Sequence, residues 1–170
     1  MCGLAELADR GAFVVHAHMP NTAPSEDIAA NRERILSDIA LAGDHPVELI
    51  AVSKVQPDER LQAALDAGQL VFGENRVQEA QEHWADRRGI EGLKLHLIGP
   101  LQSNKSEDAV ALFDVIQTID RKKIVRTISE AATKLDRFPD LFIQVNTGEE
   151  DQKSGVMPDE VEDLVAYTRE

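Results

Sequence analysis

The chain has 170 residues, of which 42% are hydrophobic and 29% are charged, and its formal net charge at pH 7 is -13. This length is sufficient for one domain with a sizeable core. The excess of negative charge argues against nucleic acid or an anionic membrane surface as the main partner. No apolar run approaches the roughly 18–20 residues that cross a bilayer. A small molecule or another protein is therefore the expected partner.

Cysteine, the residue that forms disulfides and thiolate metal centres, occurs once in the chain. The single cysteine, Cys2, excludes an internal disulfide and a thiolate metal cluster, which favours a reducing, cytoplasmic location. The five histidines show no HExxH or similar spacing. We therefore expect no metal site.

The N-terminal part differs in character from the rest of the chain. We expect residues 1–24 to form an irregular leader, because the apolar run AFVV is short and the turn-prone stretch PNTAPS follows it. Ser25 is typical of a helix start, and Ile28, Ile35 and Ile39 then recur at helical spacing. Residues 25–170 are the expected folded domain.

Beyond the first helix, short apolar segments alternate with amphipathic ones. The expected strands are 47–53, 70–72, 94–98, 115–119 and 141–146, and helical patterns separate them. Regular alternation of this kind predicts βα units around a parallel sheet. We predict an α/β fold of the (β/α) TIM-barrel type, with about five βα units preceded by an N-terminal helix.

Five units do not close a barrel, which requires eight. Residues 25–170 are therefore expected to form a partial barrel, and the strand at 141–146 is expected at its edge. An unpaired parallel edge is unfavourable. Either further strands continue the barrel, or another segment covers this edge.

Functional groups of a (β/α) barrel gather at the carboxyl ends of its strands. Lys54 follows Ser53 at the end of the first expected strand. A lysine in this place most often extends its stem to solvent. Alternatively, apolar surroundings favour the neutral amine, which can trap a carbonyl compound as a Schiff base.

Other polar residues at the strand ends also have two interpretations each. Asn75 is either a helix N-cap or a hydrogen-bond donor in a pocket. His96 is more often a hydrogen-bonded core residue than a ligand. Lys105 is expected in the first turn of a helix that Ser103 caps, where a cation is unfavourable, and Lys153 follows three acidic residues that neutralise it.

Four blocks of sequence occur in order along the chain: LIAVSKVQPDERLQAALDAGQLVFGENRVQEAQEHW, LKLHLIGPLQSNK, DVIQTID and DLFIQVNTGEEDQKSGV. Together they resemble the pyridoxal-phosphate homeostasis protein family, a relative of the N-terminal barrel of alanine racemase. The resemblance implies that Lys54 forms a Schiff base with pyridoxal 5′-phosphate. It also implies that Asn75, His96 and Asn146 contribute to cofactor binding.

The function that the resemblance implies is binding and buffering of the cofactor in vitamin B6 homeostasis, with no catalytic residue assigned. In the family, further strands carry a Ser/Gly/Thr-rich cup for the cofactor phosphate and an arginine at the pyridine nitrogen. This sequence ends at Glu170, before such residues, so weakened cofactor binding is expected. Gln56 stands where the family often has a second lysine.

Two other classes of function remain open at this point. One is a truncated scaffold that does not bind the cofactor, because the barrel is incomplete. The other is an amino-acid racemase, although two-base proton transfer requires a second base and the only tyrosine is Tyr167, in the last expected helix. A monomer, or weak self-association, is the expected state.

Overall fold

The computed structural model describes residues 13–18, 25–43, 45–150 and 152–169. Its strands are β1 (Phe13–His18), β2 (Val47–Val52), β3 (Val71–Glu74), β4 (Lys94–Leu97), β5 (Val115–Ile119) and β6 (Asp140–Ile143). Its α-helices are α1 (Ser25–Ala42), α2 (Asp58–Asp66), α3 (Val77–Trp84), α4 (Ser106–Leu112), α5 (Lys122–Leu135) and α6 (Val161–Arg169). Short 3-10 turns are η1 (Ala85–Arg87), η2 (Ser103–Lys105) and η3 (Pro158–Glu160).

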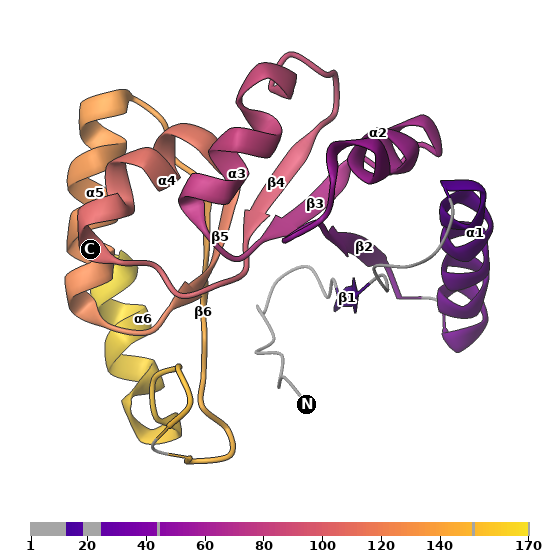
Figure 1. Ribbon diagram of the computed structural model, residues 1–170. Helices are drawn as coiled ribbons and strands as arrows, with labels where there is room; N and C mark the ends of the chain where they lie inside the picture. Colours follow the sequence, from indigo (N-terminus) through magenta and orange to yellow (C-terminus); the bar gives the residue numbers. More distant parts are fainter. Residues whose placement is uncertain (1–12, 19–24, 44, 151, 170) are drawn as a thin grey trace.

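The six strands form one parallel sheet in the order in which they occur along the chain. An α-helix follows each strand, and Figure 1 shows these helices arranged around the outside of the curled sheet. This confirms the predicted α/β fold of the (β/α) barrel type, in the form of a half-barrel. Among the described helices, none has both the length and the apolar character needed to cross a membrane.

The prediction of an irregular leader is wrong for residues 13–18, which form β1. This strand pairs in parallel with β2 along its whole length, from Phe13 beside Val47 to His18 beside Val52. The first helix, α1, therefore belongs to a βα unit, and the sheet has six strands rather than five. A short run interrupted by two histidines has weak strand character alone, and pairing with the apolar β2 makes it a strand. Residues 1–12 and 19–24 lie outside the described residues.

The other strands lie where the apolar runs predicted them, with small shifts at their ends. β5 coincides with the predicted 115–119, whereas β6 ends before the predicted 146. Beyond β6 the chain pairs with a later segment: the Asn146 N–H donates to the Val156 carbonyl at 2.9 Å, and the Val156 N–H donates to the Gln144 carbonyl at 2.8 Å. The returning chain thus covers part of the edge that was expected to be unpaired.

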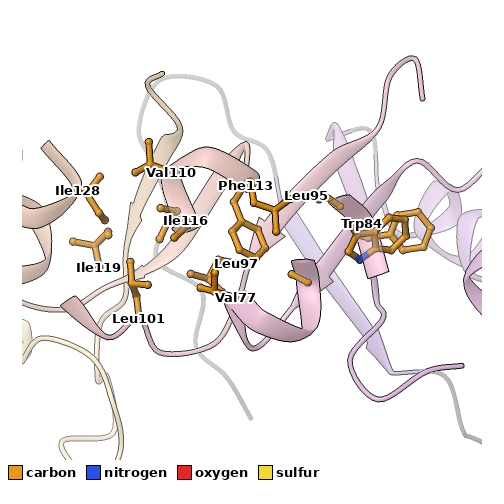
Figure 2. Close-up of a cluster of buried hydrophobic side chains, with 14 of the residues drawn as sticks. Val77, Trp84, Leu95, Leu97, Leu101, Val110, Phe113, Ile116, Ile119 and Ile128 are labelled. Atoms are coloured by element: carbon orange, nitrogen blue, oxygen red, sulfur yellow. The ribbon is translucent and has the colours of Figure 1, made fainter. Parts of the chain in front are cut away.

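The main core lies between the sheet and its surrounding helices. Figure 2 shows Leu95, Leu97 and Phe113 within this layer, and all three are fully buried. Trp84 at the end of α3 packs against Phe72 of β3, with ring centroids 4.4 Å apart. Each such buried side chain contributes about 1.5–3 kcal/mol. This packing holds the strand ends, and therefore the residues that follow them, in fixed positions.

Candidate functional site

Lys54 lies in a tight turn directly after β2. The Ser53 N–H donates to the Gly73 carbonyl at 3.0 Å, which extends the ladder between β2 and β3 by one step. The Gln56 N–H then donates to the Ser53 carbonyl at 3.2 Å and closes the turn around Lys54. The Lys54 side chain is half-buried, and within the described part of the chain its amine takes part in no hydrogen bond or ion pair.

Val55, the next residue, has an unusual backbone conformation. Its φ is 58°, in the left-handed region, and its side chain is 72% exposed. A β-branched residue pays roughly 1–2 kcal/mol for this conformation. Packing of an exposed side chain does not offset this cost. The Val55 N–H, however, donates to the Glu79 carboxylate on α3, and this bond supports the strained turn.

A buried carboxylate holds the other side of the turn. Glu74, the last residue of β3, is fully buried. Its Oε1 accepts hydrogen bonds from Ser53 Oγ at 2.7 Å and Trp84 Nε1 at 3.1 Å, and His83 Nδ1 lies 2.9 Å away. Buried polar groups are costly unless they are paired. Glu74, at the end of β3, thus joins the end of β2, through Ser53, to the end of α3, through His83 and Trp84.

Potential metal-ligating atoms of Glu74, Glu79 and His83 lie within 4.8 Å of one another. Hydrogen bonds within the protein already engage Glu74 Oε1, Glu79 Oε1 and His83 Nδ1. A bound cation would compete with these bonds. Glu74 Oε2 is buried and has no hydrogen-bond partner among the described residues, whereas the three engaged atoms form a network that holds the Lys54 turn.

Asn75, the second predicted site residue, follows β3 directly and is half-buried. Its backbone packs against Gly99: a Cβ atom at position 99 would lie 2.2 Å from the Asn75 carbonyl oxygen. Only glycine permits this approach between the ends of β3 and β4. Thr118 Oγ1 donates to the Gly99 carbonyl at 2.8 Å, which ties the end of β5 to the same point. The carboxyl ends of four neighbouring strands, β2 to β5, are thereby linked side by side.

His96 lies deeper in the sheet than Lys54. It pairs in register with Gly73, which pairs with Val52, two residues before the lysine. At the usual rise of a strand, this difference is roughly 7 Å along the sheet. The ring is 1% exposed; Gln117 Nε2 lies 2.9 Å from Nδ1, and the Glu48 carboxylate lies 3.7 Å from Nε2. These contacts fit a hydrogen-bonded core histidine beneath the site.

Asn146, the fourth predicted residue, is 5% exposed, and its amide organises the loop that follows β6. Nδ2 donates to the Glu150 carbonyl at 2.9 Å, and Oδ1 accepts from the Glu150 N–H at 3.4 Å. Gly155 has φ at 123° and lies against Asn146. A Cβ atom at position 155 would lie 2.6 Å from the Asn146 nitrogen, so there is no space for a side chain. The side chain of Asn146 is thus engaged within its own loop.

The two other lysines near the strand ends are paired with acidic residues. The helical segment begins at Ser103 with the 3-10 turn η2, but Ser103 does not cap it, because the cap position is Gln102 and no side-chain cap is made. Lys105 precedes α4, and its Nζ lies 3.3 Å from Asp108 Oδ2. Lys153 pairs with Glu150, as its acidic surroundings indicated. Among these three strand-end lysines, Lys54 alone has an unengaged amine within the described chain.

Neither Glu74 nor Glu79 stands out in the sequence. A glutamate in the first turn of a helix, such as Glu79, is common because it faces the positive end of the helix dipole. Glu74 gives one signal: it ends an apolar strand, ten residues before the only tryptophan. A buried indole N–H requires an acceptor, and a carboxylate nearby in the fold is a suitable one.

The parallel half-barrel of this chain is that of the alanine racemase N-terminal domain class. The family model described as "Alanine racemase, N-terminal domain" matches residues 26–170 of the chain. An alanine racemase of Clostridium difficile superposes with a TM-score of 0.62 over 89% of this chain at 14% identity, a likeness of fold alone.

Curated relatives are more similar in sequence. The pyridoxal phosphate homeostasis protein of Escherichia coli K12 is 37% identical over 151 residues, which is 86% of this chain and 64% of that protein. The protein of that name from Pasteurella multocida is 44% identical over 120 residues, which is 69% of this chain and 51% of that protein. The chain thus spans 51–64% of the length of these two relatives.

The structure of PipY from Synechococcus elongatus with PLP bound superposes with a TM-score of 0.69 at 34% identity, over 82% of this chain and 62% of that chain. Its structure without PLP gives a TM-score of 0.72 at 36% identity, with 82% and 65% covered. The chain belongs to the pyridoxal phosphate homeostasis protein family, within the alanine racemase N-terminal domain class.

Proposed function

We propose that this chain binds pyridoxal 5′-phosphate through Lys54 and serves cofactor homeostasis without catalysing a reaction. The observation that carries the proposal is Lys54, half-buried in a closed turn at the carboxyl end of β2, whose amine contacts no polar group among the residues that the structure describes. Support comes from the relatives, which are named pyridoxal phosphate homeostasis proteins, and from the PipY structure with PLP bound.

The turn after β2 is proposed to receive the aldehyde end of the cofactor. Lys54 would hold it through a C=N bond from its amine to the aldehyde carbon, with the aldehyde oxygen released as water. When bound, the cofactor supplies the electron-accepting ring that its enzymes use. Asn75 is proposed to border the opening at the carboxyl ends of the strands where Lys54 lies. His96 and Asn146 are proposed to stabilise that region through the contacts described above.

The chain spans 51–64% of the length of the two curated relatives. The resemblance assigns the contacts to the cofactor phosphate to strands that follow the aligned blocks. A cytoplasmic location, a small-molecule partner and a state that is monomeric or weakly self-associating are further proposals.

Covalent capture tests the proposed function directly. The protein is mixed with pyridoxal 5′-phosphate, reduced with borohydride, digested and mapped by mass spectrometry. We expect the label on Lys54, with none at this position in Lys54→Arg. The matched control is Lys134→Arg, because Lys134 lies on α5 in an exposed pair with Glu107. Label spread over surface lysines, or no label, would support the non-binding scaffold instead.

A further inference from the structure

The turn that carries Lys54 is attached to the neighbouring βα unit at both of its sides. On one side, Ser53 Oγ donates to the buried Glu74 at the end of β3. On the other, the Val55 N–H donates to Glu79 in α3. Lys54 is the residue between these two attachments. The backbone conformation at Lys54 is therefore held by the carboxylates of Glu74 and Glu79 in the next βα unit.

The two attachments are not equivalent. Ser53 also continues the ladder, since its N–H donates to the Gly73 carbonyl at 3.0 Å, so its place does not depend on Glu74 alone. Val55 has left the ladder and holds φ at 58°, a region that β-branched residues avoid. Without a bond to its N–H, the more favourable β region becomes accessible, and rotation there re-aims the adjacent Lys54.

Glu79 is suited to this role by its place in α3. It is the third residue of the helix and lies in the first turn, where the helix dipole stabilises a negative charge. The core holds α3 itself, because Val77, Ala80 and Trp84 are buried along one side. A charged acceptor on a fixed helix is a stronger anchor than a loop residue.

We propose that Glu79 is a positioning residue that aims the Lys54 amine by holding the Val55 N–H. The inference rests on the proposed function and adds the residue that orients Lys54 for reaction with an aldehyde. Glu79 acts through the turn, and its role is independent of whether the ligand carries a phosphate. Any aldehyde that reaches the turn meets a lysine whose backbone is already oriented.

The test compares Glu79→Ala, Glu79→Gln and Glu79→Ala/Val55→Gly with the unaltered chain. The rate of capture of pyridoxal 5′-phosphate at Lys54 is measured across pH by borohydride trapping. Glu79→Ala should slow capture by at least about tenfold, because small misplacements of reacting groups are costly. Glu79→Gln, whose amide oxygen still accepts the bond, should recover most of the rate. The double variant should recover part of it, because glycine adopts positive φ freely.

The matched control is Glu82→Ala, since Glu82 lies on α3 and is exposed. Its capture rate should stay within about twofold of the unaltered chain. A positioning role lowers the plateau of the pH–rate curve and leaves its midpoint in place. If Glu79 acted through its charge, both Glu79→Ala and Glu79→Gln would move the midpoint to lower pH, which would overturn the proposal.

A second measurement separates this proposal from the proposed function. Amide hydrogen exchange at Val55 and modification of Lys54 by formaldehyde with borohydride are followed by mass spectrometry without cofactor. Faster exchange and altered Lys54 modification in Glu79→Ala, with neither in Glu82→Ala, support positioning even if the unaltered chain fails to capture the cofactor. Unchanged exchange and modification in Glu79→Ala would refute it.

Discussion

Ser53 Oγ donates a 2.7 Å hydrogen bond to Glu74 Oε1, and Glu74 is fully buried. This bond crosses from the end of one strand to the end of the next. The same carboxylate oxygen accepts from the Trp84 indole, whose ring packs on Phe72. The half-barrel thus connects its core to the residue that precedes Lys54.

Removal of the Glu74 carboxylate should therefore lower stability. In Glu74→Ala, Ser53 Oγ and Trp84 Nε1 lose an acceptor in a buried place, and we expect a loss of about 3 kcal/mol in the free energy of unfolding. Urea denaturation measures the change. The exposed Glu82→Ala on the next helix is the control and should change the free energy by no more than about 0.5 kcal/mol. Equal stability of the two variants would contradict a structural role for Glu74.

Asp114 joins three segments and should make stability dependent on pH. Burial raises its pKa, but hydrogen bonds from Arg88 and the Leu95 N–H, with the charges of Arg88 and Arg137, outweigh this effect and hold the pKa below its ordinary value. The bonds to Arg88 measure 2.7 and 2.9 Å. A group with a lowered pKa in the folded state contributes stability above its unfolded pKa and loses it as pH falls through the folded pKa.

The free energy of unfolding should thus fall with pH from about 5 downward, and Asp114→Asn should make that fall shallower. At pH 7 we expect Asp114→Asn to be less stable by about 2 kcal/mol, because two arginines lose a partly buried partner. Asp38→Asn is the comparison, since Asp38 pairs with Arg34 at the exposed surface, where an ion pair contributes little, and its loss should leave the slope nearly unchanged. Parallel pH curves for the Asp114 variant and the unaltered chain would exclude this account.

Gly99 should tolerate no side chain. A Cβ atom there would lie 2.2 Å from the Asn75 carbonyl oxygen and 2.7 Å from its Cα, and both are backbone atoms that cannot rotate away. We expect Gly99→Ala to cost about 3 kcal/mol or more and to slow capture at Lys54, because the ends of β3 and β4 must separate. Gly89→Ala provides the matched control: no atom lies within 4 Å of its Cβ, so thermal melting should be unchanged.

Asn146→Ala should loosen the loop after β6 more than the barrel. The variant loses both side-chain hydrogen bonds to the Glu150 backbone, and we expect a loss of about 1–2 kcal/mol. Limited proteolysis should show faster cleavage within 147–155, with the α2 and α3 regions still protected. Loss of protection throughout the chain would instead show that the loop is integral to the core.

Val55→Gly should stabilise the protein. The residue holds φ at 58°, and glycine occupies this region without steric cost. Because the side chain is 72% exposed, little packing is lost. We expect a gain of up to about 1 kcal/mol, offset in part by the greater backbone entropy of glycine when unfolded. A loss of stability in denaturation experiments would mean that Val55 makes contacts that its exposure does not reveal.

Much of the fold is readable from the order of residues. The apolar runs at β2, β4 and β5, with helical periodicity between them, predict parallel βα units because each pattern requires a particular face to be buried. Lys54 is recognisable as a candidate for the same reason, since it follows a buried run at the end where barrel sites lie. β1 was missed, because its strand character depends on pairing with β2 rather than on its own composition.

The residues that hold the Lys54 turn in place could not be predicted from the sequence. Glu74 and Glu79 lie 20 and 25 positions after Lys54 in the chain, and their contacts with Ser53 and Val55 arise only when β3 and α3 pack beside β2. The engagement of Asn146 within its own loop, and the depth of His96 beneath the strand ends, also follow from chain geometry. Apart from β1, hydrophobic periodicity determined which segments are strands and helices, because the pattern that marks a face for burial is local in the sequence. Which polar atoms meet, and therefore how the amine of Lys54 is held, was decided by the tertiary structure, because hydrogen bonds require distances of about 3 Å that only the packed sheet sets.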